Sequence, residues 1–146
     1  MATYSFLDVN ASLSGTGGNI NLASGAGSAD EGVTIEAVED KSTMTIGADG
    51  SVMHSLHGST AVKISVKLLK TSPTNKQLMQ MYNQQTSSSA DHGKNTLTVS
   101  IQVTGENITV SQVAFKKVPT LAYGKEAGTN EWVFDGGTSS VTLGNY

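Results

Sequence analysis

The sequence predicts a mainly β protein, an antiparallel β-sandwich or barrel-like fold that carries one flanking helix. Nearly every periodic segment alternates apolar and polar residues, which is typical of strands with one buried face. In the clearest strand Val62, Ile64, Val66 and Leu68 alternate with polar side chains. The chain of 146 residues suits one domain with a sizeable core, and it has no internal repeat or dividing linker.

The N-terminal third predicts short strands joined by small residues. Apolar residues alternate over 7–13 and again over 20–22, with a glycine-rich turn at residues 15–18 between them. Residues 23–32 are rich in Gly, Ala and Ser, which predicts a mobile loop. A strand is expected to resume at Val33.

Asp49-Gly50 predicts the tip of a hairpin at about residues 40–59. The pair fits a type I′ turn, in which both central residues have positive φ. Such a turn places Ile46 opposite Met53, so that two apolar side chains meet across the strands. The rest of this segment is polar and has too few apolar residues to form a core of its own.

Two further turns are predicted in the C-terminal half. Gly105-Glu106 fits a type II′ turn and would place Val103 opposite Ile108. The glycines that follow Asp135 predict a final hairpin between residues 131–134 and residues 141–143.

One helix is predicted over about residues 73–85. Ser72 is a good N-cap residue, and Pro73 is favoured at the first helical position. The apolar face that should pack on the sandwich has i, i+3, i+4 spacing and consists of Leu78, Met81 and Tyr82.

Charge and composition exclude some functions. Charged residues make up 14% of the chain, against roughly 25% in an ordinary soluble domain. The neutral polar surface that this implies can be buried against other copies at little desolvation cost, although a loop-rich β domain has a similar composition. The net charge is -3 and all nine basic residues are lysine, which argues against a basic or arginine-reading DNA-binding surface.

No catalytic, cofactor or metal site is predicted. The chain has no cysteine, and His54 and His57 would lie on opposite faces of a strand, while His92 is distant. The glycine-rich segments match no phosphate-binding motif, and no nucleophile elbow is present. Trp132 lies in an aromatic and aliphatic run that is typical of a core strand. We therefore expect a protein that is not an enzyme.

The N-terminus, MATYSFLDVN, shows no secretory signal, and no apolar stretch is long enough to span a membrane. We expect synthesis in a cytoplasm.

Several short motifs, in their order and spacing, carry a family resemblance. They are Ala2–Phe6, Glu39–Lys41, Thr45–Gly50, Val62–Leu69, Thr71–Asn75 and Asn130–Asp135. Together they resemble the tail tube proteins of contractile-tailed bacteriophages, the myophage tail tube family, over most of the chain.

The resemblance implies a tail tube fold and a structural role in the virion tail. Six subunits would close into a ring, and rings would stack into a tube, assembled in the bacterial host cytoplasm, whose lumen conducts DNA without sequence-specific contact. The implied partners are other copies of the chain, the tail sheath protein, the baseplate or tube initiator, the tail terminator and the tape measure protein. No cofactor and no membrane is implied.

Two sets of site residues follow from this reading. The hairpin is expected to contact neighbouring subunits through Asp40, Lys41, Thr45, Ile46, Asp49, Gly50 and Met53. The candidate acidic residues of the lumen, each in or beside a predicted strand, are Glu36, Glu39, Glu106, Glu131 and Asp135. A non-catalytic β-sandwich that binds carbohydrate or protein, and a tube protein of a secretion system or tailocin, remain as alternatives.

Overall fold

The computed structural model describes residues 3–5, 8–16, 18–22 and 28–144. In these residues the chain forms ten strands and one helix. In chain order they are β1 (Val9–Gly15), β2 (Gly18–Asn21), β3 (Ser28–Ala37), β4 (Ser42–Ile46), β5 (Val52–Leu56), β6 (Val62–Leu69), α1 (Thr74–Thr86), β7 (Asn95–Ile101), β8 (Glu106–Lys117), β9 (Thr129–Gly136) and β10 (Thr138–Thr142).

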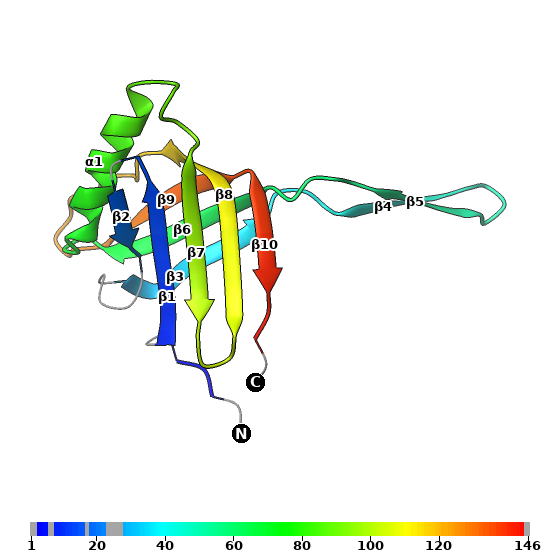
Figure 1. The fold of residues 1–146 in the computed structure, drawn as a ribbon, viewed down its shortest axis with the longest axis horizontal. Coiled ribbons are helices and arrows are strands. Elements are labelled where there is room, and N and C mark those ends of the chain that lie inside the picture. Colours follow the sequence, from blue (N-terminus) through cyan, green and yellow to red (C-terminus); the bar gives the residue numbers. More distant parts are fainter. Residues whose placement is uncertain (1–2, 6–7, 17, 23–27, 145–146) are drawn as a thin grey trace.

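Eight strands form one antiparallel sheet in the order β2-β1-β7-β8-β9-β6-β3, with β10 also paired to β8. The sheet folds over on itself into two layers without closing into a barrel, and Figure 1 shows β9, β6 and β3 crossing behind β1, β7, β8 and β10. Strand β8 belongs to both layers, because Asn107–Ser111 pairs with β10 and Ala114–Lys117 pairs with β9. Gln112 lies at the junction with a φ of 57°.

The core lies between the two layers. The predicted strand at residues 62–69 is confirmed, and its four alternating aliphatic side chains are buried. Trp132 is also a core residue. It packs edge-on against Phe115, whose ring lies 4.8 Å from that of Phe134 and 5.6 Å from that of Tyr82 on the helix. These rings join the helix to the sheet through apolar contact.

Helix α1 starts one residue later than predicted, at Thr74, so Pro73 takes the N-cap position instead of the first helical position. The Ser72 hydroxyl accepts a hydrogen bond from the Thr74 backbone N–H at 3.3 Å, which satisfies one of the amides left open at a helix start. Leu78 and Met81 are buried and Tyr82 packs against the core. No helix in the described part of the chain is long and apolar enough to cross a membrane.

A buried amide pair, which no pattern in the sequence predicted, holds the other end of the helix. Gln85 and Asn95 are fully buried and exchange two hydrogen bonds, of 2.6 and 2.7 Å, and Gln85 also donates to the Thr16 carbonyl. A Cβ atom on Gly15 would lie 1.7 Å from Asn95 Oδ1, so only glycine fits there. Each buried polar atom of the pair is thereby satisfied.

The predicted register of the first hairpin is wrong by one residue on one strand. Ile46 pairs with Val52, and Met53 pairs with Thr45. The Gly47 N–H donates to the Ser51 carbonyl, which closes a three-residue loop whose last residue, Gly50, has a φ of 89°. Both turn types need a positive φ at this glycine, so Asp-Gly does not distinguish them.

The second predicted turn is also displaced. Strand β7 ends at Ile101, and residues 102–105 form a four-residue loop whose last member, Gly105, has a φ of 78°. Ile108 therefore pairs with Val99, and Val103 lies in the loop, exposed. The prediction failed because Val103 continues the alternation of apolar residues past the end of strand β7, although its side chain is not buried.

The predicted final hairpin does not form. Strand β9 runs to Gly136, and after Gly137 the chain turns across to pair β10 with β8 instead of β9. A Cβ atom on Gly136 would lie 2.3 Å from Val110 Cγ1, and one on Gly137 would lie 2.5 Å from Gln112 Oε1. These glycines allow the two layers to approach closely where the chain passes between them.

The predicted loop at residues 23–32 is shorter than expected. Strand β3 already begins at Ser28, and its register with β6 shifts between Ser28 and Val33. Residues 23–27, and Leu7 of the predicted first strand, lie outside the described residues.

Candidate assembly surfaces

Strands β4 and β5 form a two-stranded sheet of their own that extends well away from the folded layers (Figure 1). Every side chain of these two strands is exposed except that of Ser55, which is half-buried. An isolated two-stranded hairpin is marginally stable in water. The fold therefore supplies no core for this segment.

The hairpin is amphipathic. Residues that pair directly across an antiparallel ladder share a face, and the faces alternate along the strands. Met44, Ile46, Val52 and Leu56 consequently lie on one side together with Ser42 and His54, and the four apolar side chains are 54 to 81% exposed. We call these four residues the apolar hairpin face. Of the predicted hairpin residues, Thr45 and Met53 lie on the opposite side.

The tip of the hairpin is organised by Asp49. Its Oδ1 accepts a hydrogen bond from the Ser51 backbone N–H at 3.0 Å, and the Gly50 N–H donates to the Gly47 carbonyl. Hydrogen bonding to Ser51, from its side chain and then its backbone, lowers the pKa of the Asp49 carboxyl below its ordinary value of 3.8. The charged form of Asp49 therefore favours this turn.

At the base of the hairpin, backbone hydrogen bonds continue beyond the ends of β4 and β5. The His57 N–H donates to the Lys41 carbonyl at 2.8 Å, and His57 Nε2 lies 2.8 Å from the Thr43 hydroxyl. The Val38 N–H donates to the Ala61 carbonyl where the chain leaves β3. Glu39 and Asp40 are exposed in the connection between these points. The predicted hairpin residues thus all lie in the hairpin or at its base, but they do not lie on one face of it.

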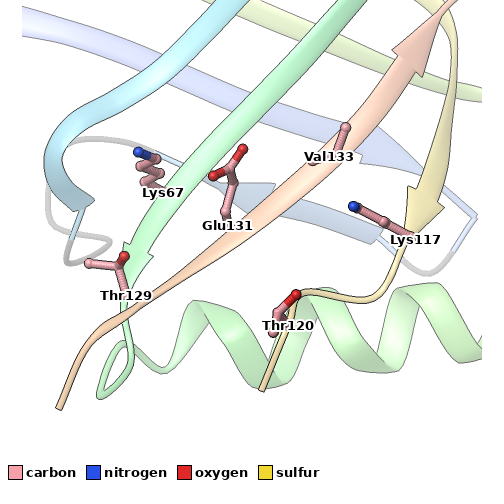
Figure 2. A pocket seen from close by; sticks show the side chains of 6 residues that line it. All are labelled: Lys67, Lys117, Thr120, Thr129, Glu131 and Val133. Atoms are coloured by element: carbon pink, nitrogen blue, oxygen red, sulfur yellow. The ribbon is translucent and has the colours of Figure 1, made fainter. Parts of the chain in front are cut away.

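Three of the five candidate lumen acids come together. The outward side of β3, β6, β9 and the C-terminal half of β8 carries the group that we call the charged face: Glu36, Lys63, Lys67, Lys116, Lys117, Glu131 and Asp135. Figure 2 shows Lys67, Glu131 and Lys117 around a pocket on this face. In register, Lys63 lies between Glu36 and Asp135, and Lys67 lies opposite Glu131, which accepts a hydrogen bond from the Ser65 hydroxyl at 2.9 Å.

The other two candidate acids are elsewhere. Glu39 is in the connection to the hairpin, and Glu106 begins β8 beside an apolar pocket between the layers. The charged face therefore carries three carboxylates and four lysines, so it is mixed in sign and not acidic as a whole. Alternation alone could not show this, because it aims lysines and acids outward alike.

The outward side of the other layer carries no charged residue on the strands that the structure describes. Its residues on β1, β2, β7, the N-terminal half of β8 and β10 are all Ser, Thr or Asn, and we call them the uncharged face: Asn10, Ser12, Ser14, Asn19, Asn21, Thr96, Thr98, Ser100, Asn107, Thr109, Ser111, Thr138, Ser140 and Thr142. The two outer surfaces of the molecule thus differ in kind.

Sequence reasoning missed three members of the apolar hairpin face, Met44, Val52 and Leu56. The signal was present as alternation on both strands, Met44 with Ile46 and Val52 with Leu56. The register error, which matched Ile46 with Met53, hid this signal.

Sequence reasoning also missed the uncharged face. The signal for that face is the unbroken use of Ser, Thr and Asn at alternate positions of five strands.

Comparison with models of protein families identifies the family of the chain. The model for the Bacteriophage PhiTE tail tube protein matches residues 1–144. The chain belongs to this family. It is a structural subunit of a phage tail tube and a component of the virion tail, as the resemblance predicted. No curated protein matches the chain in sequence.

Solved structures with a similar fold share little sequence with this tail tube subunit. The PVC sheath/tube terminator of an extracellular contractile injection system has a TM-score of 0.65 at 11% identity, covering 98% of this chain and 99% of that one. The PVC sheath-tube complex gives 0.59 at 12%, covering 96% and 91%. The tail of an empty GTA particle, solved with C6 symmetry, gives 0.59 at 16%, covering 97% and 100%. At these identities the likeness shows the fold.

Proposed function

We propose that six copies of this subunit close into a ring and that the rings stack into a hollow tube through which DNA passes into the host. The observation that carries the proposal is the β4–β5 hairpin, which extends away from the layers with its apolar side chains exposed. Large apolar side chains gathered on an exposed element mark an interaction site. The sixfold symmetry of the similar GTA tail supports the number of subunits.

Ring closure also accounts for the sheet edges. In the described residues β3 pairs only with β6, β2 only with β1 and β10 only with β8, so each presents one open side. Open edges promote uncontrolled association unless they are covered. Pairing with the next subunit around a ring covers them, and we propose that the whole chain acts as one tail tube domain with its hairpin at about residues 40–59.

We propose that the charged face lines the lumen and that the uncharged face lies outside. The three candidate acids on this face stand among four lysines, so the face is close to neutral. Register places Lys63 and Lys67 beside carboxylates that offset their charge, and pockets on the face bring Lys116 to Asp135 and Lys117 to Glu131. DNA then meets no continuous basic strip that would retain it. Glu39 and Glu106 lie off this face and contribute to the lumen only if the ring brings them inward.

The remaining partners follow from the role as a tube subunit. We propose contacts with the tail sheath protein, the tail terminator, the baseplate or tube initiator and the tape measure protein, and assembly in the host cytoplasm without catalysis. Similar folds occur in a sheath/tube terminator, a sheath-tube complex, a tube-terminating cap and a baseplate, which supports the first three contacts.

Negative-stain microscopy and sedimentation of the purified full chain test the proposal. Rings or tubes with sixfold end views are expected. A compact monomer at all concentrations, in the presence of tail initiator complexes, would favour the binding-module alternative.

The lumen assignment has its own experiment. Phage with Glu131→Lys and Asp135→Lys should assemble tails but eject DNA more slowly, because added lysines hold phosphates. Phage with Thr98→Lys and Thr138→Lys, which add two lysines to the uncharged face on strands that do not pair with each other, should eject at the normal rate. The reverse pattern would place the uncharged face in the lumen.

A further inference from the structure

The apolar hairpin face has a matching surface on the same chain. An apolar pocket opens between the two layers, near the end of the molecule that holds the β7–β8 loop. Its lining includes Val33 of β3, Val99 of β7 and Ile108 of β8, none of which is fully buried, together with Ser100 and Glu106 at its polar side. Tyr4, which is 62% exposed, stands beside it. We call this pocket the interlayer groove.

The hairpin of one molecule does not reach its own interlayer groove. Strands β4 and β5 continue away from the layers, in the direction in which β3 and β6 leave them (Figure 1). The residues that line the groove belong instead to the two layers and to the segment before β1. Any contact between the two surfaces therefore joins different copies of the chain.

We propose that the apolar hairpin face of one subunit docks in the interlayer groove of the next. The inference deepens the proposed tube assembly and rests on it, because it names the surface that receives the hairpin. The hairpin brings four exposed apolar side chains, and the groove offers aliphatic side chains from both layers. Docking removes both from water, which is the main favourable term in such associations.

The two surfaces make the contact self-propagating. They are different patches, so each copy gives one hairpin and receives one, and the contact is heterologous. A heterologous contact generates a closed ring or an open stack, as a tube requires. The opposite side of the hairpin, with Thr43, Thr45 and Met53, stays in contact with solvent in this arrangement.

Thiol cross-linking tests the docking, because the chain has no cysteine of its own. The double variant Ile46→Cys/Ile108→Cys, assembled into tubes from the full chain and treated with a short bismaleimide, should give a ladder of linked copies. The matched control Ile46→Cys/Thr109→Cys moves the second thiol one residue along β8, to the uncharged face. It should remain almost entirely monomeric on a denaturing gel.

The outcomes separate the docking from the tube role. Tubes that form normally but link only in the control would overturn the docking and leave the proposed function standing. Tubes that link in neither variant would do the same. If Ile108→Cys prevents folding, Val52→Cys/Val99→Cys tests the same contact, with Val52→Cys/Thr98→Cys as its control. A soluble full chain that never assembles would overturn both proposals together.

Discussion

Two hairpins of this protein are built alike and used differently. The β7–β8 hairpin and the β4–β5 hairpin each alternate apolar and polar residues, and each has a glycine with positive φ as the last residue of its loop. Leu97 and Val110 of the first pair across the ladder and are buried. Ile46 and Val52 of the second also pair, and both are more than half exposed.

The difference shows what the alternation of apolar and polar residues leaves undetermined. Alternation specifies a strand with one apolar side but does not say what will cover that side. In β7–β8 the other layer covers it, so those residues stabilise the subunit. In β4–β5 nothing in the described fold does, so we expect those residues to act between subunits. The following changes separate these two roles.

The largest effect on the isolated subunit is expected from Leu97→Ala. This side chain is 1% exposed, and its truncation should reduce the free energy of unfolding by about 2–5 kcal/mol. Urea unfolding of the unassembled subunit measures it. Thr98→Ala, on the outward side of the same strand, should change stability by no more than about 0.5 kcal/mol. Equal losses in the two variants would mean that the β7 register is wrong.

Changing the hairpin tip should have an intermediate effect, confined to the hairpin. Asp49→Val removes the hydrogen bond to Ser51. Gly50→Val forces a β-branched residue into a φ of 89°, and that backbone strain alone costs on the order of 1–2 kcal/mol. Tube yield by electron microscopy should fall. Gly58→Val, at a glycine with open space around it, is the control. Normal tubes from the double variant would show that the tip is dispensable.

Removing the apolar hairpin face should hardly affect the subunit. Ile46→Ser with Val52→Ser changes two exposed side chains, so the free energy of unfolding should move by about 0.5 kcal/mol or less. Assembly should nevertheless be lost. Thr45→Ser with Met53→Ser, on the other side of the hairpin, should still assemble. Strong destabilisation by the first pair would mean that the hairpin packs within its own subunit.

The smallest effect is expected from pH. Because the folded-state pKa of Asp49 is lowered, its stabilisation of the turn is present above the ordinary value of 3.8 and is lost as the pH falls through the lowered value. Amide chemical shifts of Ser51 should follow this titration, and Asp49→Asn should abolish it. A transition above 3.8 would contradict the assigned hydrogen bonds.

Much of the fold was predictable because local patterns agreed with the final burial. The strand at residues 62–69, the Ser72-Pro73 helix start and the core position of Trp132 all follow from such patterns. The registers were not, since turn types that share an Asp-Gly or Gly signal place different residues opposite each other. The Gln85–Asn95 pair was also hidden, because it joins residues that only the fold brings together.

The candidate site was less predictable than the fold. Sequence located the hairpin but not its faces, because these depend on the register between Ile46 and Val52. It named acids in or beside strands, yet only the topology shows that Glu36, Glu131 and Asp135 share a surface with lysines while Glu106 does not.

Hydrogen exchange, read by mass spectrometry on the free subunit and on assembled tubes, tests the central claim most directly. Amides of β4 and β5 should exchange rapidly in the free subunit and become protected in tubes, because the hairpin then packs on a neighbour. Amides of β7 and β8 should be protected in both states and so serve as the internal reference. Rapid exchange of residues 42–56 in assembled tubes would contradict the account.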